Sequence, residues 1–270
     1  MAFDAFEAAG WERRAQQYER FWGGVTGHVI EPLLDAAGVE GGQAVLDLAT
    51  GPGHVAAGAA ARGAVPTGVD VAQAMVDLAR DLHPGIEFIQ ASAAELPLEE
   101  SSFDAVIGNF MILHVGEPER VARQIVRALR PGGRVALSTW DVPARALMFG
   151  VMLDAIGASG ASPPDDLPEG PPFFRFADEG EFTQLLTDAE LEGAEVNTVE
   201  FPQTFESSEV LWDGLVGATV RVSALVTSQS EEIQQRIRAA FDERVAEFRT
   251  NGEVELPMSV KIASAHKPTT

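Results

Sequence analysis

The sequence predicts an α/β protein built on a doubly wound, mostly parallel sheet. Between residues 44 and 140, short apolar runs typical of buried strands alternate with segments of helical pattern. The first apolar run leads into a glycine-rich turn, and the second ends at the acidic residue Asp70. Strands that are separated by helices of this length are joined by right-handed crossovers and therefore lie parallel.

The individual elements follow from hydrophobic periodicity, with glycine and proline marking the breaks. Aromatic residues gather on one side of a first helix within residues 3–22, and a second helix is expected over residues 27–37. The predicted strands cover residues 44–48, 65–69, 86–89, 103–108, 134–140, 195–205 and 254–263. After the first strand, one predicted helix ends at Arg62, and the others span residues 72–82, 117–129, 178–190, 210–226 and 231–248. Regularity weakens after Trp140, and the proline- and aspartate-rich residues 162–172 predict a surface loop.

Composition and charge narrow the classes of function. With 270 residues, of which 46% are hydrophobic, the chain can bury one large core, so we expect a single domain over residues 1–270. The formal net charge of -22 repels phosphate backbones and anionic lipids, so neither a nucleic-acid partner nor membrane insertion is expected. The absence of cysteine excludes disulfides and thiolate catalysis, and with the lack of a basic leader it favours a cytoplasmic protein.

A glycine-rich turn, Asp-Leu-Ala-Thr-Gly-Pro-Gly, follows the first predicted strand at residues 47–53. Glycines let the backbone approach a ligand closely, and in a doubly wound sheet this turn lies beside the crevice where ligands bind. Asp70, at the end of the next strand, is placed to accept hydrogen bonds from two ribose hydroxyls. The pattern also matches a dinucleotide fingerprint, but Pro52 removes a donor for pyrophosphate, and Asp47 suits an ammonium group better than a phosphate.

Five stretches of the sequence together resemble the class I S-adenosylmethionine-dependent methyltransferase family, in particular its ubiquinone and menaquinone biosynthesis C-methyltransferase branch. They are residues 47–53, 68–75, 91–97, 102–109 and 129–134. Each stretch is weak alone, but the ordered set covers about residues 40–140 and is specific. The resemblance implies a Rossmann-like seven-stranded sheet whose last strand is antiparallel, with the two late predicted strands completing it.

The resemblance also implies the cofactor, S-adenosyl-L-methionine, and the residues that hold it. In the family, the first motif holds the methionine part, the second strand end holds the ribose, and an N-terminal tyrosine helps to close the site. The implied cofactor-binding residues are Tyr18, Asp47, Ala49, Thr50, Gly51, Gly53, Asp70, Val71, Met75, Ser92, Ala93, Gly108 and Asn109. Many relatives have glycine in place of Ala49 and aspartate in place of Ser92, so a weaker contact with the adenine is expected.

Methyl transfer from a sulfonium is an in-line displacement, so the protein needs a general base only when the acceptor is protonated and weakly acidic. His114, after the fourth predicted strand, is the candidate catalytic base, with local packing as the alternative. His28, in the N-terminal region, is a second candidate. Asn109 and Asp141 both follow strand ends and offer oxygen ligands, but no third acid is obvious nearby, so no metal site is expected.

Three segments outside the sheet pattern are expected to enclose the site: a helical lid at residues 1–38 and cap elements at residues 141–177 and 205–250. The cap regions are rich in bulky apolar residues, namely Met148, Phe149, Met152, Phe173, Phe174, Phe176 and Trp212. They predict an apolar or aromatic small-molecule acceptor, although the same residues suit a sheet cover or a homodimer interface equally well. Three other classes stay open: a non-methylating enzyme with the same cofactor, an NAD-binding oxidoreductase, and a binding protein without turnover.

Overall fold

The computed structural model describes residues 2–269, and Met1 and Thr270 lie outside the described part. Its centre is one sheet in the order β3-β2-β1-β4-β5-β8-β6, with the short strand β7 paired to β8. The strands are β1 (Ala44–Leu48), β2 (Val65–Asp70), β3 (Glu87–Gln90), β4 (Phe103–Gly108), β5 (Leu129–Trp140), β6 (Glu192–Phe205), β7 (Arg249–Thr250) and β8 (Glu253–His266). Strands β1 to β5 run parallel, whereas β8 runs antiparallel to both β5 and β6. The predicted fold class and the antiparallel last strand are therefore confirmed, and β7 is an addition to the seven expected strands.

Both faces of the central strands β1 and β4 are buried, as their position between helices requires. In β1, Val45 belongs to one hydrophobic core, and Leu46 and Leu48 belong to the other. Successive side chains of a strand point to opposite faces, and a parallel sheet covered on both sides therefore reads as a nearly continuous apolar run. This is why the first strand was visible in the sequence as an apolar run interrupted only by Asp47.

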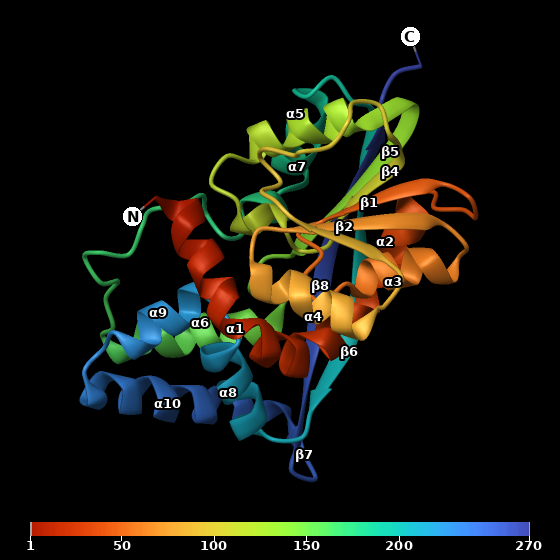
Figure 1. Cartoon of the computed structure of the whole chain (residues 1–270). Helices are drawn as coiled ribbons and strands as arrows, with labels where there is room; N and C mark the ends of the chain where they lie inside the picture. Colours follow the sequence, from red (N-terminus) through yellow and green to blue (C-terminus); the bar gives the residue numbers. More distant parts are fainter. Residues whose placement is uncertain (1, 270) are drawn as a thin grey trace.

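Helices cover both faces of the sheet (Figure 1). They are α1 (Phe3–Thr26), α2 (Ile30–Ala36), α3 (His54–Ala61), α4 (Gln73–Leu82), α5 (Pro118–Ala128), α6 (Leu147–Ser159), α7 (Glu179–Thr187), α8 (Ser208–Gly217), α9 (Arg221–Thr227) and α10 (Glu231–Val245). Helices α3 and α4 pack on one face, whereas α5 packs on the other with α7. In the sheet, β2 and β3 lie on one side of β1, and β4 and β5 lie on the other side. The strand order thus reverses between β1 and β4, which places a crevice at the carboxyl ends of these two strands.

Helix α1 lies outside both layers and joins the sheet to the C-terminal helices. It packs against α4 on one side and α8 on the other, and Figure 1 shows it between the sheet and the group of α6, α8, α9 and α10. The buried Trp22 side chain donates a hydrogen bond of 2.9 Å from Nε1 to the carbonyl oxygen of Ala218. This contact joins parts of the chain that are almost two hundred residues apart in sequence.

Helix α6 is the main element that the sequence did not predict, because residues 147–159 fell in the region of weak regularity. Its side chains are apolar nearly all round, and those of Met148, Phe149, Met152 and Ile156 are buried. A helix that is buried on most sides has no polar face, so it gives no amphipathic period for a sequence pattern to detect.

The single helix predicted over residues 210–226 is two helices. Helix α8 ends at Gly217 and α9 begins at Arg221, and the two are bent by 99°. The break coincides with Ala218, whose carbonyl accepts the hydrogen bond from Trp22, so tertiary contact with α1 accompanies it. Within residues 2–269 no single helix is long and apolar enough to cross a membrane, and only this bent pair reaches that length and composition jointly.

Candidate functional site

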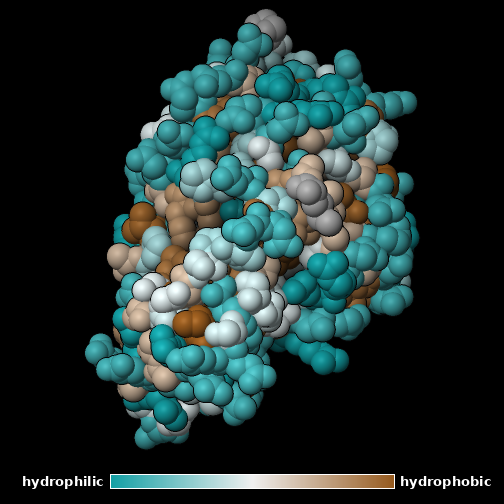
Figure 2. Space-filling model, turned by 90° about the vertical axis from the view of Figure 1, so that its left-hand side faces the viewer, coloured by the Kyte–Doolittle hydropathy of each residue, from teal (hydrophilic) through white to brown (hydrophobic). Residues whose placement is uncertain are grey.

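The carboxyl ends of four parallel strands open into one cavity. Ala49 follows β1, Asp70 ends β2, Asn109 follows β4 and Trp140 ends β5, and all four residues line the cavity. The cavity has a volume of about 330 Å³. Residues from α1, α6, α9 and the segment before α7 complete its wall, so N-terminal and C-terminal parts of the chain enclose a space at the sheet edge. Figure 2 shows the face of the molecule where α1 and α9 lie, with apolar patches among hydrophilic margins.

The glycine-rich turn is held in shape from below by the carboxylate of Asp47. Its Oδ2 accepts hydrogen bonds from the Thr50 hydroxyl at 2.5 Å and from the backbone N–H of Ala56 at 3.1 Å. Ala49 and Gly51 both have left-handed φ angles, 49° and 53°, which lets the turn present backbone to the cavity. Alanine in this conformation is strained, because its Cβ crowds the backbone in the left-handed region. Burial raises the pKa of Asp47 to about 7, against the opposing effect of its two hydrogen bonds.

Asp70 lies between the turn and α4 and faces the cavity. Its Oδ2 accepts from the N–H of Gly51 and its Oδ1 from the N–H of Ala72, both at 2.9 Å. Each carboxylate oxygen has a second acceptor site, so two further donors can bind from the cavity side. Burial raises the pKa of Asp70 to about 6, although the backbone hydrogen bonds oppose this rise. Asp70 is therefore an ionised double acceptor at neutral pH.

Tyr18 on α1 covers the turn. Its ring lies over Gly51, since a Cβ built on that glycine would be 3.9 Å from Tyr18 Cε1. The ring is also edge-on to Trp11, with centroids 5.6 Å apart, and stacks on Trp22 at 6.4 Å. Burial raises the pKa of Tyr18 to about 12, so its hydroxyl stays protonated at neutral pH. Tyr18 thus lies against the glycine-rich turn, and its predicted role in closing over the cofactor stays a prediction.

The structure brings most of the predicted cofactor residues to one end of the cavity. Those that line it are Tyr18, Ala49, Gly51, Asp70, Val71, Met75, Ser92, Ala93 and Asn109. Asp47, Thr50, Gly53 and Gly108 lie behind this surface and shape it. Gly53 has a φ angle of 86° at the start of α3, and a Cβ on Gly108 would lie 2.6 Å from Met111 Cγ. The left-handed backbone at Gly53 and the close approach of Met111 at Gly108 therefore favour glycine at these two positions.

The side-chain amide of Asn109, the residue after β4, is held in a fixed orientation by hydrogen bonds. The Ser138 hydroxyl donates to Asn109 Oδ1 at 2.7 Å, and Asn109 Nδ2 donates to the carbonyl of Thr26 at 3.4 Å. Ser138 also accepts from the N–H of Phe110 at 2.9 Å. These contacts connect β4, β5 and α1 at the middle of the cavity wall.

The other end of the cavity is apolar and rich in aromatic side chains. Those that line it are Trp22, Phe110, Trp140, Phe149, Met152, Phe173 and Phe174. Phe110 stacks on Trp140 with ring centroids 4.0 Å apart, and Phe149 contacts Phe173 at 5.5 Å. Four of the seven cap residues singled out in the sequence thus face the cavity. Met148, Phe176 and Trp212 do not line it, and Trp212 packs on Phe241 instead.

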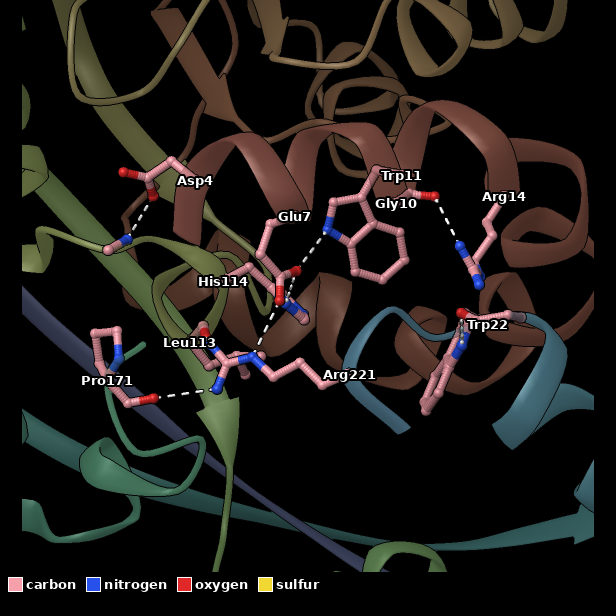
Figure 3. Close-up of polar contacts among 12 residues, drawn as sticks. Asp4, Glu7, Gly10, Trp11, Arg14, Trp22, Leu113, His114, Pro171 and Arg221 are labelled. Atoms are coloured by element: carbon pink, nitrogen blue, oxygen red, sulfur yellow. Dashed lines mark hydrogen bonds and ion pairs between the residues drawn. The ribbon is translucent and has the colours of Figure 1, made fainter. Parts of the chain in front are cut away.

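A buried carboxylate at the rim, Glu7 on α1, was missed in the sequence (Figure 3). Glu7 Oε2 lies 3.0 Å from His114 Nδ1 and accepts from Trp11 Nε1 at 3.1 Å, while its Oε1 accepts from Arg221 Nε at 3.0 Å. Burial raises the pKa of Glu7, but His114 and Arg221 lower it to below its usual value overall. The sequence did contain one signal for this site. Glu7 lies at helical spacing from Phe3, Trp11 and Tyr18, and an acidic side chain on such an aromatic helix face needs hydrogen-bonding or charged partners when it is buried.

The remaining polar candidates lie apart from this group. Asp141 accepts from the Ser259 hydroxyl at 2.8 Å and lies 3.8 Å from Lys261 Nζ; unlike Asn109, it does not line the cavity. Across residues 2–269, no group of three or more histidine, cysteine, aspartate or glutamate side chains is arranged to hold a metal ion. His28 stacks on Phe201 at 4.5 Å and does not line the cavity.

Comparison with known proteins assigns this architecture to a family. The sequence model of a family described as a methyltransferase domain matches residues 46–137. A demethylmenaquinone methyltransferase of Chlorobaculum tepidum is 31% identical over 175 residues, which are 61% of this chain and 70% of that protein. The chain belongs to the S-adenosylmethionine-dependent methyltransferase family. The predicted family is therefore confirmed, including its likeness to the quinone-methylating branch.

Other similarities to this methyltransferase family cover less of the sequence or show the fold alone. A demethylmenaquinone methyltransferase of Clavibacter sepedonicus is 32% identical over 128 residues, 46% of this chain and 49% of that protein. The chain spans about half the length of the first curated relatives that it matches. A solved putative methyltransferase of Bacillus halodurans has a TM-score of 0.56 at 21% identity, covering 89% of this chain and 99% of that one. The [4+2]-cyclase SpnF has a TM-score of 0.53 at 21% identity, covering 90% and 81%.

The cavity of this methyltransferase-family chain fits the family cofactor, S-adenosylmethionine. The left-handed turn at Ala49 and Gly51 leaves room for a ligand against the backbone, where a larger side chain would intrude. Asp70 offers two free acceptor sites for ribose hydroxyls. Met75 and Val71 give the same end of the cavity apolar surface for a purine, and Ser92 offers a hydroxyl at its edge.

Proposed function

We propose that this protein transfers a methyl group from S-adenosylmethionine to an apolar or aromatic small molecule. One observation supports this most directly: one cavity, partly open to solvent, has the predicted cofactor residues at one end and an aromatic wall at the other. Such a cavity holds donor and acceptor in line, which converts a bimolecular reaction into one within a complex. The named relatives act in menaquinone and ubiquinone biosynthesis, which favours an acceptor with an aromatic or quinone-like ring.

The residues of the chain would contribute mainly by positioning. S-adenosylmethionine, when bound, supplies an activated methyl group as a sulfonium. Asp70 and the turn at Ala49 and Gly51 bind one end of the donor, and Tyr18 covers that end and excludes water. Asn109, fixed by Ser138, lies where the two halves of the cavity meet and orients polar groups there. Exclusion of water matters because it strengthens the electrostatic contacts within the site.

We further propose His114 as the general base for an acceptor that carries a hydroxyl or an acidic carbon. It lines the cavity, and its Nδ1 already contacts Glu7. No hydrogen bond occupies its Nε2 among the described residues, and this atom is not among the buried atoms without a partner. Nε2 is therefore the accessible nitrogen of the ring, and a neutral imidazole can take a proton there.

In this proposal, the segments outside the sheet cover the site. Residues 1–38 form the lid, residues 141–177 and 205–250 form the cap, and all belong to one domain of residues 1–270. The net charge of -22 and the absence of cysteine favour a cytoplasmic enzyme without nucleic acid or membrane insertion. A homodimer would leave the cavity intact, because the cavity is enclosed by one chain.

Calorimetric and thermal-shift titrations with S-adenosylmethionine, S-adenosylhomocysteine and NAD test the cofactor. We expect both sulfur cofactors to bind and raise the melting temperature, and we expect NAD to have no effect. An acceptor screen that measures release of S-adenosylhomocysteine then separates methyl transfer from the alternatives. Cofactor binding with product formation but no S-adenosylhomocysteine would indicate a non-methylating enzyme. Binding of NAD alone would overturn the proposal.

A further inference from the structure

We propose that Glu7 is a positioning residue that sets the tautomer of His114, and that Arg221 holds Glu7 in the orientation this requires. This proposal rests on the proposed function, because the tautomer of His114 matters for activity only if the unprotonated Nε2 acts as the base. It extends that function by assigning roles to two residues from opposite ends of the chain, on α1 and α9. The contacts are shown in Figure 3.

The protonation of Glu7 determines which nitrogen of His114 carries hydrogen. The Glu7 side chain is only 3% exposed, its Oε1 accepts from the Arg221 cation and its Oε2 accepts from the indole N–H of Trp11, and the pKa of Glu7 lies below its usual value although burial raises it. It is therefore a carboxylate, which accepts hydrogen bonds and has none to donate. Since Nδ1 lies 3.0 Å from Glu7 Oε2, Nδ1 must carry the hydrogen, and in the neutral ring Nε2 keeps its lone pair toward open space.

Arg221 determines how Glu7 is oriented. Its Nε donates to Glu7 Oε1 at 3.0 Å, which leaves Oε2 for His114 and Trp11. The other two nitrogens of the guanidinium donate to the carbonyls of Pro171 and Leu113 at 3.1 and 2.9 Å. Leu113 precedes His114 in the chain, so Arg221 fixes the backbone beside the imidazole as well as the carboxylate that contacts it.

The carboxylate and the imidazole come from different elements of the fold. Glu7 is part of α1, which lines the cavity, whereas His114 ends a 3-10 helix (Ile112–His114) that follows β4. The helix that lines the cavity therefore also supplies the carboxylate that contacts His114 Nδ1.

Replacement of the carboxylate by an amide gives a direct test. In Glu7→Gln the cation of Arg221 retains the amide oxygen, so the amide NH2 takes the place of Oε2. This NH2 faces His114 Nδ1, which must then accept, and the indole N–H of Trp11 loses its acceptor. We expect long-range ¹H–¹⁵N correlation spectra of protein labelled at its 5 histidines to show the His114 hydrogen on Nδ1 in the wild type and on Nε2 in Glu7→Gln. His114→Gln identifies the resonance, and the spectra need neither cofactor nor acceptor.

The control is Glu12→Gln, the same substitution on the same helix. Glu12 is exposed, accepts from the N–H of Ala74 and does not line the cavity, so the His114 spectrum should remain that of the wild type. With 1-naphthol as the first acceptor probe, we expect Glu7→Gln to lower kcat by about 100-fold or more, with little change in KM for S-adenosylmethionine. Glu12→Gln should leave kcat unchanged.

The outcomes separate this proposal from the proposed function. An Nε2–H tautomer in the wild type, or an unchanged tautomer in Glu7→Gln, would overturn the role of Glu7, whatever the enzyme does. If Glu7→Gln is unstable, Arg221→Met gives a second reading, because release of Oε1 should produce a mixture of tautomers where the proposal holds and no change where it fails. Failure of S-adenosylmethionine to bind would overturn the proposed function and leave the tautomer result standing.

Discussion

Replacement of Asp70 by asparagine tests how this protein binds its cofactor. Asp70 accepts one backbone N–H on each oxygen, from Gly51 and Ala72, and its two remaining acceptor sites are assigned to ribose hydroxyls. Asparagine has only one acceptor oxygen, so the variant loses one charged hydrogen bond and weakens the other. A hydrogen bond to a charged group contributes about 1.5–3 kcal/mol, so Asp70→Asn should weaken binding by about 2–3 kcal/mol. This corresponds to roughly a 30- to 150-fold increase in Kd.

Isothermal titration calorimetry with S-adenosylhomocysteine measures this change, and circular dichroism verifies that the variant is folded. The pKa of Asp70 is raised by burial to about 6, so wild-type affinity should fall as the pH decreases through about 6, whereas the variant should lack this step. Asp77→Asn is the matched control, because Asp77 is an exposed residue of α4 that contacts Gln73 and Arg80 and does not line the cavity. A folded Asp70→Asn protein with wild-type Kd would refute the assignment of Asp70 to the ribose.

Three further predictions concern stability and selectivity. Burial raises the pKa of Asp47 from 3.8 to about 7, so the protonated side chain stabilises the fold at low pH. This contribution to the free energy of unfolding should decline by roughly 4 kcal/mol in total as the pH rises from about 4 to about 7. Urea unfolding without cofactor should show this decline in the wild type but not in Asp47→Asn. Gly53→Ala should lower the free energy of unfolding by about 2–4 kcal/mol, since the residue has a φ angle of 86° and its new Cβ would lie 2.8 Å from Phe88 Cζ. Gly42→Ala, with a φ angle of 83° and no atom within 4 Å of the Cβ, should lose only the conformational part, and equal losses would contradict the clash. Phe174→Ala should change the order of preferred acceptors, while Trp212→Ala, which removes a side chain outside the cavity, should lower the melting temperature and leave that order unchanged.

The central part of the fold and the cofactor end of the site were predictable because they depend on local patterns. A parallel strand buried on both faces is a short apolar run, and a turn with left-handed residues requires small residues at fixed positions. The stretch from Asp47 to Gly53 and the acid at Asp70 therefore indicated the crevice before any contact was known. The ends of neighbouring parallel strands meet at one edge, which is why residues 20 to 60 positions apart lie around the same cavity.

The acceptor end was predictable only in part, because its composition did not indicate which side chains face inward. Helix α6 in the cap is apolar nearly all round, so it has no polar face to reveal its period. Phe174 and Trp212 have similar chemistry in the sequence, and only packing places the first in the cavity wall and the second against Phe241. The break between α8 and α9 likewise coincides with a tertiary contact, the hydrogen bond from Trp22 to Ala218.

The sequence by itself determined the doubly wound sheet, the glycine-rich turn, the acidic strand end and the family of this protein, since each is encoded within a few neighbouring residues. Only the tertiary structure decided the contacts around Glu7, which joins Trp11, His114 and Arg221. The physical reason is that a hydrogen bond between residues more than one hundred positions apart leaves no periodic trace in the sequence. Such a contact forms once α1 and α9 have been brought to the same edge of the sheet by the burial of their apolar faces.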